Sequence, residues 1–68
     1  MRHETEASVR RRVAECWGFW CPAVTLMELG YEGGWCTHAA FRVAGVGYEA
    51  DFRTLAMAPA FDDPGEGE

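Results

Sequence analysis

Residues 48–53 alternate without a break between apolar and charged side chains, Tyr-Glu-Ala-Asp-Phe-Arg. Successive side chains of a strand point to opposite faces of its sheet, so this period of two is typical of a β-strand with one buried and one solvated face. A single strand cannot fold alone, because its apolar face and its main-chain polar groups both need partners. The rest of the chain must therefore supply neighbouring strands and a layer that covers Tyr48, Ala50 and Phe52.

A second alternating segment, residues 35–43, predicts the antiparallel partner of this strand. Its odd-numbered residues are expected to face the core and its even-numbered residues to face outward. Glycine tolerates positive φ, so we expect Gly45 at the first central position of a two-residue type II′ turn. The predicted register places Val43 opposite Tyr48, Phe41 opposite Ala50 and Ala39 opposite Phe52 on the inner face, with Arg42 opposite Glu49 on the outer face.

Residues 23–31 predict a third neighbouring strand, joined to the second by Glu32-Gly33-Gly34. The expected pairs are Tyr31 with Trp35, Leu29 with Thr37 and Met27 with Ala39 inside, and Glu28 with His38 outside. A short helix over residues 22–29 is the alternative, because proline suits a first helical turn and Gly30 suits a C-cap. The matching register favours the strand, and the expected sheet is a three-stranded β-meander.

Residues 5–17 predict a helix. Val9, Val13, Cys16 and Trp17 recur at the spacing of one helical face, and Thr5 suits the N-cap. Pro22 prevents the helix from continuing. The apolar face of this helix is expected to lie on the inner face of the sheet. The predicted fold is thus a small two-layer α+β domain, an N-terminal helix on a three-stranded meander (αβββ).

A chain of 68 residues allows one domain, expected over residues 1–61, followed by an acidic flexible tail over residues 62–68. Residues 54–58 either prolong the last strand or form one helical turn. Folding at this size buries only about 60% of the chain surface, so a metal, a disulfide or a homodimer partner would add needed stability. The polar start of the chain resembles no secretory signal, which favours a cytoplasmic location with reduced thiols.

The net charge of −5 argues against direct binding of nucleic acid, because its phosphates attract basic surfaces and repel acidic ones. The predicted order of elements resembles that of a double-stranded-RNA-binding domain in outline, but the basic residues of such a domain are absent here. We expect a non-catalytic protein-binding module, a small inhibitor of phage or mobile-element type. Its carboxylates would mimic phosphates on the nucleic-acid-binding surface of a basic partner protein. The candidate acidic binding residues are Glu28, Glu49, Asp51, Asp62 and Asp63.

Three aromatic residues fall within residues 16–21. Trp17 lies on the apolar stripe of the helix, and Trp20 continues that stripe if the helix survives Gly18. Aromatic stripes at helical spacing are usually buried. Phe19 points elsewhere and is a candidate exposed anchor. Phe19 and Trp20 therefore join the candidate partner-binding residues.

Cysteine and histidine side chains raise the alternative of a zinc-stabilised domain, with Cys16, Cys21, Cys36 and His38 as ligands. The long Cys16–Cys21 spacing and the expected outward position of Cys36 and His38 argue against it, and we expect no metal or other cofactor. The set of Cys36, His38 and Glu28 resembles a thiol–imidazole–carboxylate triad. A flat solvated sheet face offers such a triad no pocket, so catalysis is not expected.

Overall fold

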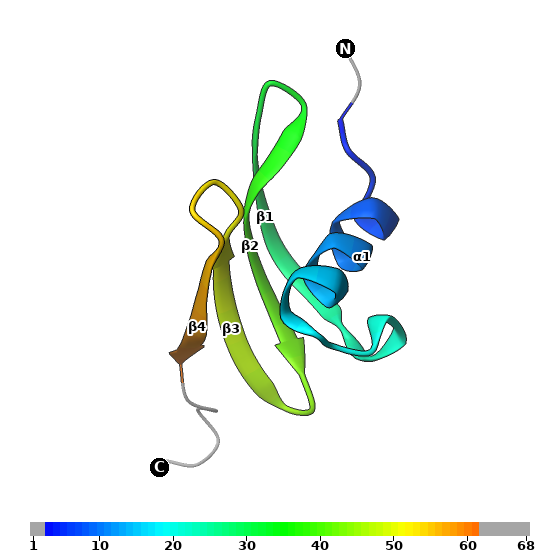
Figure 1. Ribbon diagram of the computed structural model, residues 1–68, viewed down its shortest axis with the longest axis vertical. Helices are drawn as coiled ribbons and strands as arrows, with labels where there is room; N and C mark the ends of the chain where they lie inside the picture. Colours follow the sequence, from blue (N-terminus) through cyan, green and yellow to red (C-terminus); the bar gives the residue numbers. More distant parts are fainter. Residues whose placement is uncertain (1–2, 62–68) are drawn as a thin grey trace.

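The computed structural model describes residues 3–61, which form one helix packed on a four-stranded antiparallel sheet (Figure 1). The helix α1 spans Glu6–Trp17, and a short 3₁₀ turn, η1, spans Cys21–Ala23. The strands are β1 (Thr25–Glu32), β2 (Trp35–Val43), β3 (Val46–Asp51) and β4 (Ala56–Phe61), in the spatial order β1-β2-β3-β4. The α+β prediction is confirmed. The predicted count of three strands is wrong, because a fourth strand follows β3.

The helix begins and ends as its sequence predicts. The Thr5 hydroxyl accepts a hydrogen bond from the Ser8 N–H at 3.1 Å, which satisfies one free donor of the first turn. Gly18 adopts φ 78°, and its N–H donates to the carbonyl of Ala14 at 2.8 Å. Glycine accepts this left-handed conformation without a steric penalty, so the helix stops there.

The fourth strand follows a tight turn over residues 52–55, in which Leu55 adopts φ 58°. This turn reverses the chain, so that Ala56 pairs with Asp51 and Met57 pairs with Ala50. The segment has little alternation and contains Pro59, which a central strand would exclude but an edge strand tolerates. Residues 54–58 therefore neither prolong β3 nor form a helical turn.

The turn between β2 and β3 is formed by Ala44 and Gly45, whose φ angles of 53° and 81° match a type I′ turn. Gly45 thus occupies the second central position, not the first. The observed pairs are Val43 with Val46, Arg42 with Gly47, Phe41 with Tyr48 and Ala39 with Ala50. Each partner lies two residues from the predicted one, so every side chain keeps its predicted face. The shift also brings the rings of Phe41 and Tyr48 into a stack with centroids 5.4 Å apart.

Two irregularities in the pairing of β1 with β2 change the faces of several residues. They lie between Leu26 and Glu28 and between Gly30 and Tyr31. An extra residue in one strand reverses the side-chain alternation beyond it. The observed pairs are Leu29 with Ala39, Gly30 with His38, Tyr31 with Cys36 and Glu32 with Trp35. All the predicted pairs in this hairpin are therefore wrong. Residues 25–32 nevertheless form the strand β1, which excludes the alternative helix over residues 22–29.

The consequences of these irregularities appear in three side chains. Met27 and Trp35, both expected in the core, are 45% and 66% exposed. Cys36, expected on the outer face, is 1% exposed and belongs to the core. Burial raises the pKa of the Cys36 thiol, which donates a hydrogen bond to the carbonyl of His38.

The core lies between α1 and the inner face of the sheet. Its most deeply buried side chains are Val9, Val13, Cys36 and Phe41. Phe52 lies at its edge, where its ring contacts Trp17 and the guanidinium of Arg12 lies 4.1 Å from the ring centre. Within residues 3–61, no helix has the length and apolarity that crossing a membrane requires.

Candidate functional site

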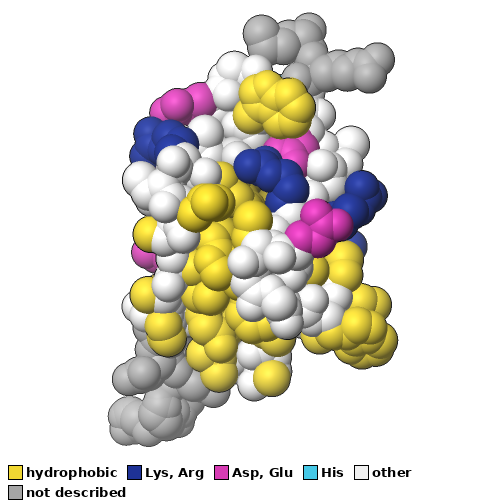
Figure 2. Space-filling view, in the orientation of Figure 1, with side chains coloured by type: hydrophobic (Ala, Val, Ile, Leu, Met, Phe, Trp, Pro, Cys, Tyr) yellow, Lys and Arg dark blue, Asp and Glu magenta, His cyan; other side chains and the backbone are white. Residues whose placement is uncertain are grey.

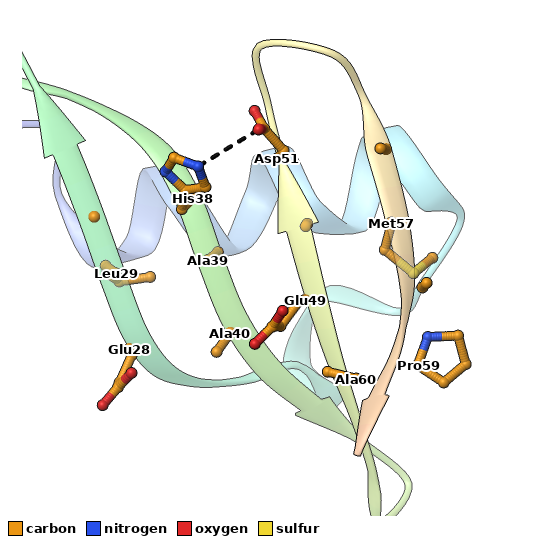
Figure 3. A pocket seen from close by; sticks show the side chains of 14 residues that line it. Glu28, Leu29, His38, Ala39, Ala40, Glu49, Asp51, Met57, Pro59 and Ala60 are labelled. Carbon is orange, nitrogen blue, oxygen red and sulfur yellow. Dashed lines mark ion pairs between the residues drawn. The ribbon is translucent and has the colours of Figure 1, made fainter.

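The outer face of the sheet, turned away from α1, carries an open hollow of about 860 Å³ (Figure 3). All four strands contribute to it. Its ionisable side chains are Glu28 from β1, His38 from β2, and Glu49 and Asp51 from β3. The predicted acidic residues of the sheet, Glu28, Glu49 and Asp51, are thus brought to one surface. The two other predicted carboxylates, Asp62 and Asp63, lie outside the described residues.

Small residues separate the carboxylates of this hollow. Ala40 lies opposite Glu28 on one side and opposite Glu49 on the other, and Ala58 follows Glu49 across the sheet. Gly30, Ala56 and Ala60 extend this floor of small side chains. Because alanine and glycine project little from a sheet, another chain could approach the main chain closely here. Ala56, Ala58 and Ala60 lie in β4, and the sequence analysis missed their role because it did not predict that strand.

The charge of Asp51 is partly compensated by Arg53. Its carboxylate accepts hydrogen bonds from the side chain and the main-chain N–H of Arg53, and these bonds lower the pKa of Asp51 to about 2. Arg53 also lies 3.5 Å from the carboxylate of Glu32. The carboxylate is therefore ionised at neutral pH, but its charge is partly cancelled by the adjacent guanidinium.

His38 completes this cluster. Its Nε2 accepts a hydrogen bond from Arg53 at 3.0 Å, because arginine has only donors. The ring proton then lies on Nδ1, which donates to the Thr37 hydroxyl at 3.1 Å. The same Nε2 lies 3.4 Å from the Asp51 carboxylate, a contact that becomes an ion pair when the imidazole is protonated (Figure 3). The predicted partner of His38, Glu28, lies opposite Ala40 instead.

Glu28 and Glu49 differ from Asp51 in their surroundings. Both are exposed, and within residues 3–61 neither forms an ion pair. The predicted neighbour of Glu49, Arg42, lies opposite Gly47. Because Glu28 and Glu49 stand on strands separated by β2, their Cα atoms are about 10 Å apart, twice the ordinary spacing of strands. The hollow therefore presents two uncompensated carboxylates on either side of an alanine.

The two aromatic candidates exchange roles relative to the prediction. Phe19, expected as an exposed anchor, packs against the rings of Phe41 and Tyr48 with centroids 5.8 Å and 5.4 Å away. Trp20, expected in the helical stripe, is 74% exposed. The helix ends at Trp17, so Trp20 no longer follows the helical spacing on which that prediction depended. Neither residue lines the outer hollow.

The alternative zinc ligands are not brought together. Cys36 lies in the core, whereas the imidazole of His38 projects into the outer hollow, and Cys16 is exposed on the helix. Among the described residues, no group of three or more His, Cys, Asp or Glu side chains is placed to hold a metal ion. The same separation means that Cys36, His38 and Glu28 do not form a triad.

Glu4, which was not predicted to have a structural role, links the helix to β2. Its carboxylate accepts hydrogen bonds from Ser8 Oγ at 2.7 Å, from Arg12 Nη1 at 2.5 Å and from the N–H of Cys36 at 3.1 Å. Ser8 and Arg12 are four residues apart and share one side of α1, and Glu4 precedes the N-cap Thr5, four residues before Ser8. That spacing was the available signal. The contact fixes the start of α1 against β2 and leaves the opposite sheet face free.

Comparison with known proteins adds no functional assignment. No family model matches the chain, and neither a curated protein nor a solved structure matches it significantly. The geometry of the outer hollow is therefore the basis for a functional proposal.

Proposed function

We propose that this chain is a non-catalytic protein-binding module whose outer hollow receives a basic segment of a partner protein. The observation that carries the proposal is the pair of uncompensated carboxylates, Glu28 and Glu49, on either side of a floor of alanine. Lysine or arginine side chains of the partner would bind these carboxylates, and the small floor would let the partner's main chain approach. A surface that normally binds nucleic acid has such side chains, so the module would act as an inhibitor of that surface.

The ion pairs of Asp51 favour a different pair of carboxylates for this proposed role. Asp51 and Glu49 are neighbours on one face of β3, but Arg53 already compensates Asp51. Glu28 and Glu49 therefore form the more effective pair, because neither must break an internal ion pair before it binds a cation. Asp51 instead holds Arg53 and His38 in place at one end of the hollow.

A titration with an arginine-rich helical peptide, followed by amide chemical shifts, tests this proposal. We expect the largest shifts in residues 28–30, 38–40, 49–51 and 56–58. The double variant Glu28→Lys/Glu49→Lys should bind at least tenfold more weakly, a loss of about 1.4 kcal/mol. Added salt should weaken the parent complex, because the contact depends on exposed charges.

The matched control is Glu6→Lys/Glu15→Lys, which changes the net charge equally but alters exposed positions on α1. This variant should retain most of the affinity, and thermal melts should show that both double variants are folded. Equal weakening by the two double variants would show a non-specific attraction to net charge. Shifts centred on Trp20, or no binding of the peptide, would also contradict the proposal.

A further inference from the structure

His38 is the diagonal neighbour of both uncompensated carboxylates of the outer hollow. Glu28 and Glu49 each lie opposite Ala40, and His38 is two residues from Ala40 on the same face of β2. Such diagonal neighbours have Cα atoms about 7 to 8 Å apart. Helix α1 and the hydrophobic side chains gathered beside it lie on the opposite side of the sheet (Figure 2). The charges that surround His38 are therefore those of the outer face.

The imidazole of His38 is held from both neighbouring strands. On the β1 side it lies beside Gly30, where an added Cβ would be 3.5 Å from the Cβ of His38 and 3.7 Å from Nδ1. On the β3 side its Nε2 accepts a hydrogen bond from Arg53 and lies 3.4 Å from the Asp51 carboxylate (Figure 3). The side chain is nevertheless 50% exposed. The ring is thus fixed in the hollow and can still exchange a proton with solvent.

Protonation of His38 reverses the role of its Nε2. A protonated imidazole has a donor at each nitrogen, and arginine has only donors, so the hydrogen bond between Arg53 and His38 is lost. The Nε2 then donates to the nearby Asp51 carboxylate. Arg53 keeps its own hydrogen bonds to Asp51 and its ion pair with Glu32. Protonation therefore adds one positive charge to this end of the hollow and removes none.

The other charged groups around the ring keep their charge in mild acid. Aspartate and glutamate ordinarily titrate near pH 4, arginine stays protonated, and histidine changes its charge between about pH 5 and pH 8. Among the described residues that line the hollow, His38 is the only histidine, and β4 contributes uncharged residues. A change of charge in the hollow in mild acid therefore belongs to His38. The charged groups nearest the ring are Glu28 and Glu32 from β1, Glu49 and Asp51 from β3, and Arg53 from the turn after β3.

We propose that protonation of His38 releases the basic partner segment from the outer hollow, so that binding is strong at neutral pH and weak in mild acid. This inference rests on the proposed function, because it concerns the regulation of the same site. A protonated imidazole attracts Glu28 and Glu49 and repels the lysine or arginine side chains that would bind them. Binding of the segment and binding of the proton therefore oppose each other, and the opposition is reciprocal.

Fluorescence anisotropy with a histidine-free, end-capped, arginine-rich helical peptide tests this regulation at about pH 8 and about pH 5.5, at one ionic strength. The peptide keeps its charge over this range, so a change in affinity comes from the protein. The dissociation constant of the parent should rise at least about threefold in acid, whereas that of His38→Gln should change by less than about 1.5-fold. Glutamine does not titrate but can still accept a hydrogen bond from Arg53, and circular dichroism checks that the variant is folded. In a second measurement, NMR signals of the His38 ring should show that bound peptide delays its protonation to lower pH.

His3→Gln is the matched control, because His3 is the other histidine of the chain and stacks on Tyr31 outside the hollow. This variant should keep the pH dependence of the parent. Equal binding at both pH values would overturn the regulation by His38 and leave the proposed function intact. A loss of affinity in acid that His38→Gln retains, or that His3→Gln abolishes, would overturn it as well. No peptide binding at about pH 8 would contradict the proposed function and this inference together.

Discussion

The carboxylate of Glu4 lies 2.5 Å from the guanidinium of Arg12 in a position where only 2% of the Glu4 side chain is exposed. Arg12 in turn donates to the carbonyl of Cys36, and the N–H of Cys36 donates to Glu4. The segment before the helix, the helix itself and β2 are thus joined by one network. The buried carboxylate of Glu4 is thus stabilised by the guanidinium of Arg12 and by the main-chain N–H of Cys36.

Replacement of Glu4 by glutamine should lower the free energy of unfolding by about 1 to 3 kcal/mol, the range for losing a buried hydrogen-bonded partner of a charged group. The expected loss is not larger, because Arg12 keeps some contact with solvent. Urea denaturation at neutral pH measures it. Glu6→Gln is the control, since Glu6 is exposed in the first helical turn and should change stability by less than about 0.5 kcal/mol. Equal effects in the two variants would contradict the network's role.

Acid should remove the contribution of Glu4. Burial opposes ionisation of this carboxyl, but the hydrogen bonds from Ser8, Cys36 and Arg12 outweigh it and hold the pKa of Glu4 below its ordinary value of 4.5. The native state therefore binds fewer protons than the unfolded state, and the stabilisation is fully present above pH 4.5 and is lost as the pH falls through the native pKa.

The difference in unfolding free energy between the parent and Glu4→Gln should consequently be constant near neutral pH and shrink once the pH falls below 4.5. Urea titrations at several pH values measure this difference. Asp51, whose pKa is lowered to about 2, also loses its charge in acid, but it does so equally in both proteins and cancels from the comparison. A difference that grows on acidification would show that Glu4 is protonated in the native state.

The sequence was most informative where one local pattern decided the structure. The spacing of Val9 and Val13 and the capping hydroxyl of Thr5 predicted the helix nearly to the residue, because these signals act within a few residues of each other. The inner positions of Ala39, Phe41 and Ala50 also followed from alternation alone. A register error of two residues did not disturb them.

The errors arose where distant contacts override local preference. Local reasoning reserved positive φ for glycine, yet Ala44 adopts it, and the resulting register stacks Phe41 on Tyr48. Met27 and Cys36 changed faces because the bulges, one in β1 and one in β2, have no reliable sequence signal. For the site, Glu28, Glu49 and Asp51 were predicted on one face, but the compensation of Asp51 by Arg53 depends on side-chain contacts that alternation does not specify. The alanines of β4 have no distinctive pattern at all.

The turn between β2 and β3 offers a test of this register. Ala44 adopts φ 53°, a left-handed conformation that costs a residue with a Cβ roughly 1 kcal/mol, whereas asparagine tolerates it better. Ala44→Asn creates the Asn-Gly pair that type I′ turns prefer, so it should raise the free energy of unfolding by about 0.5 to 1 kcal/mol. Thermal and urea denaturation measure the change. Ala58→Asn makes the same substitution at an exposed position of β4, where asparagine is disfavoured, and should give no gain. A loss of stability in Ala44→Asn equal to that of Ala58→Asn would instead support the type II′ turn with Gly45 first, and with it the register in which Phe41 lies opposite Ala50.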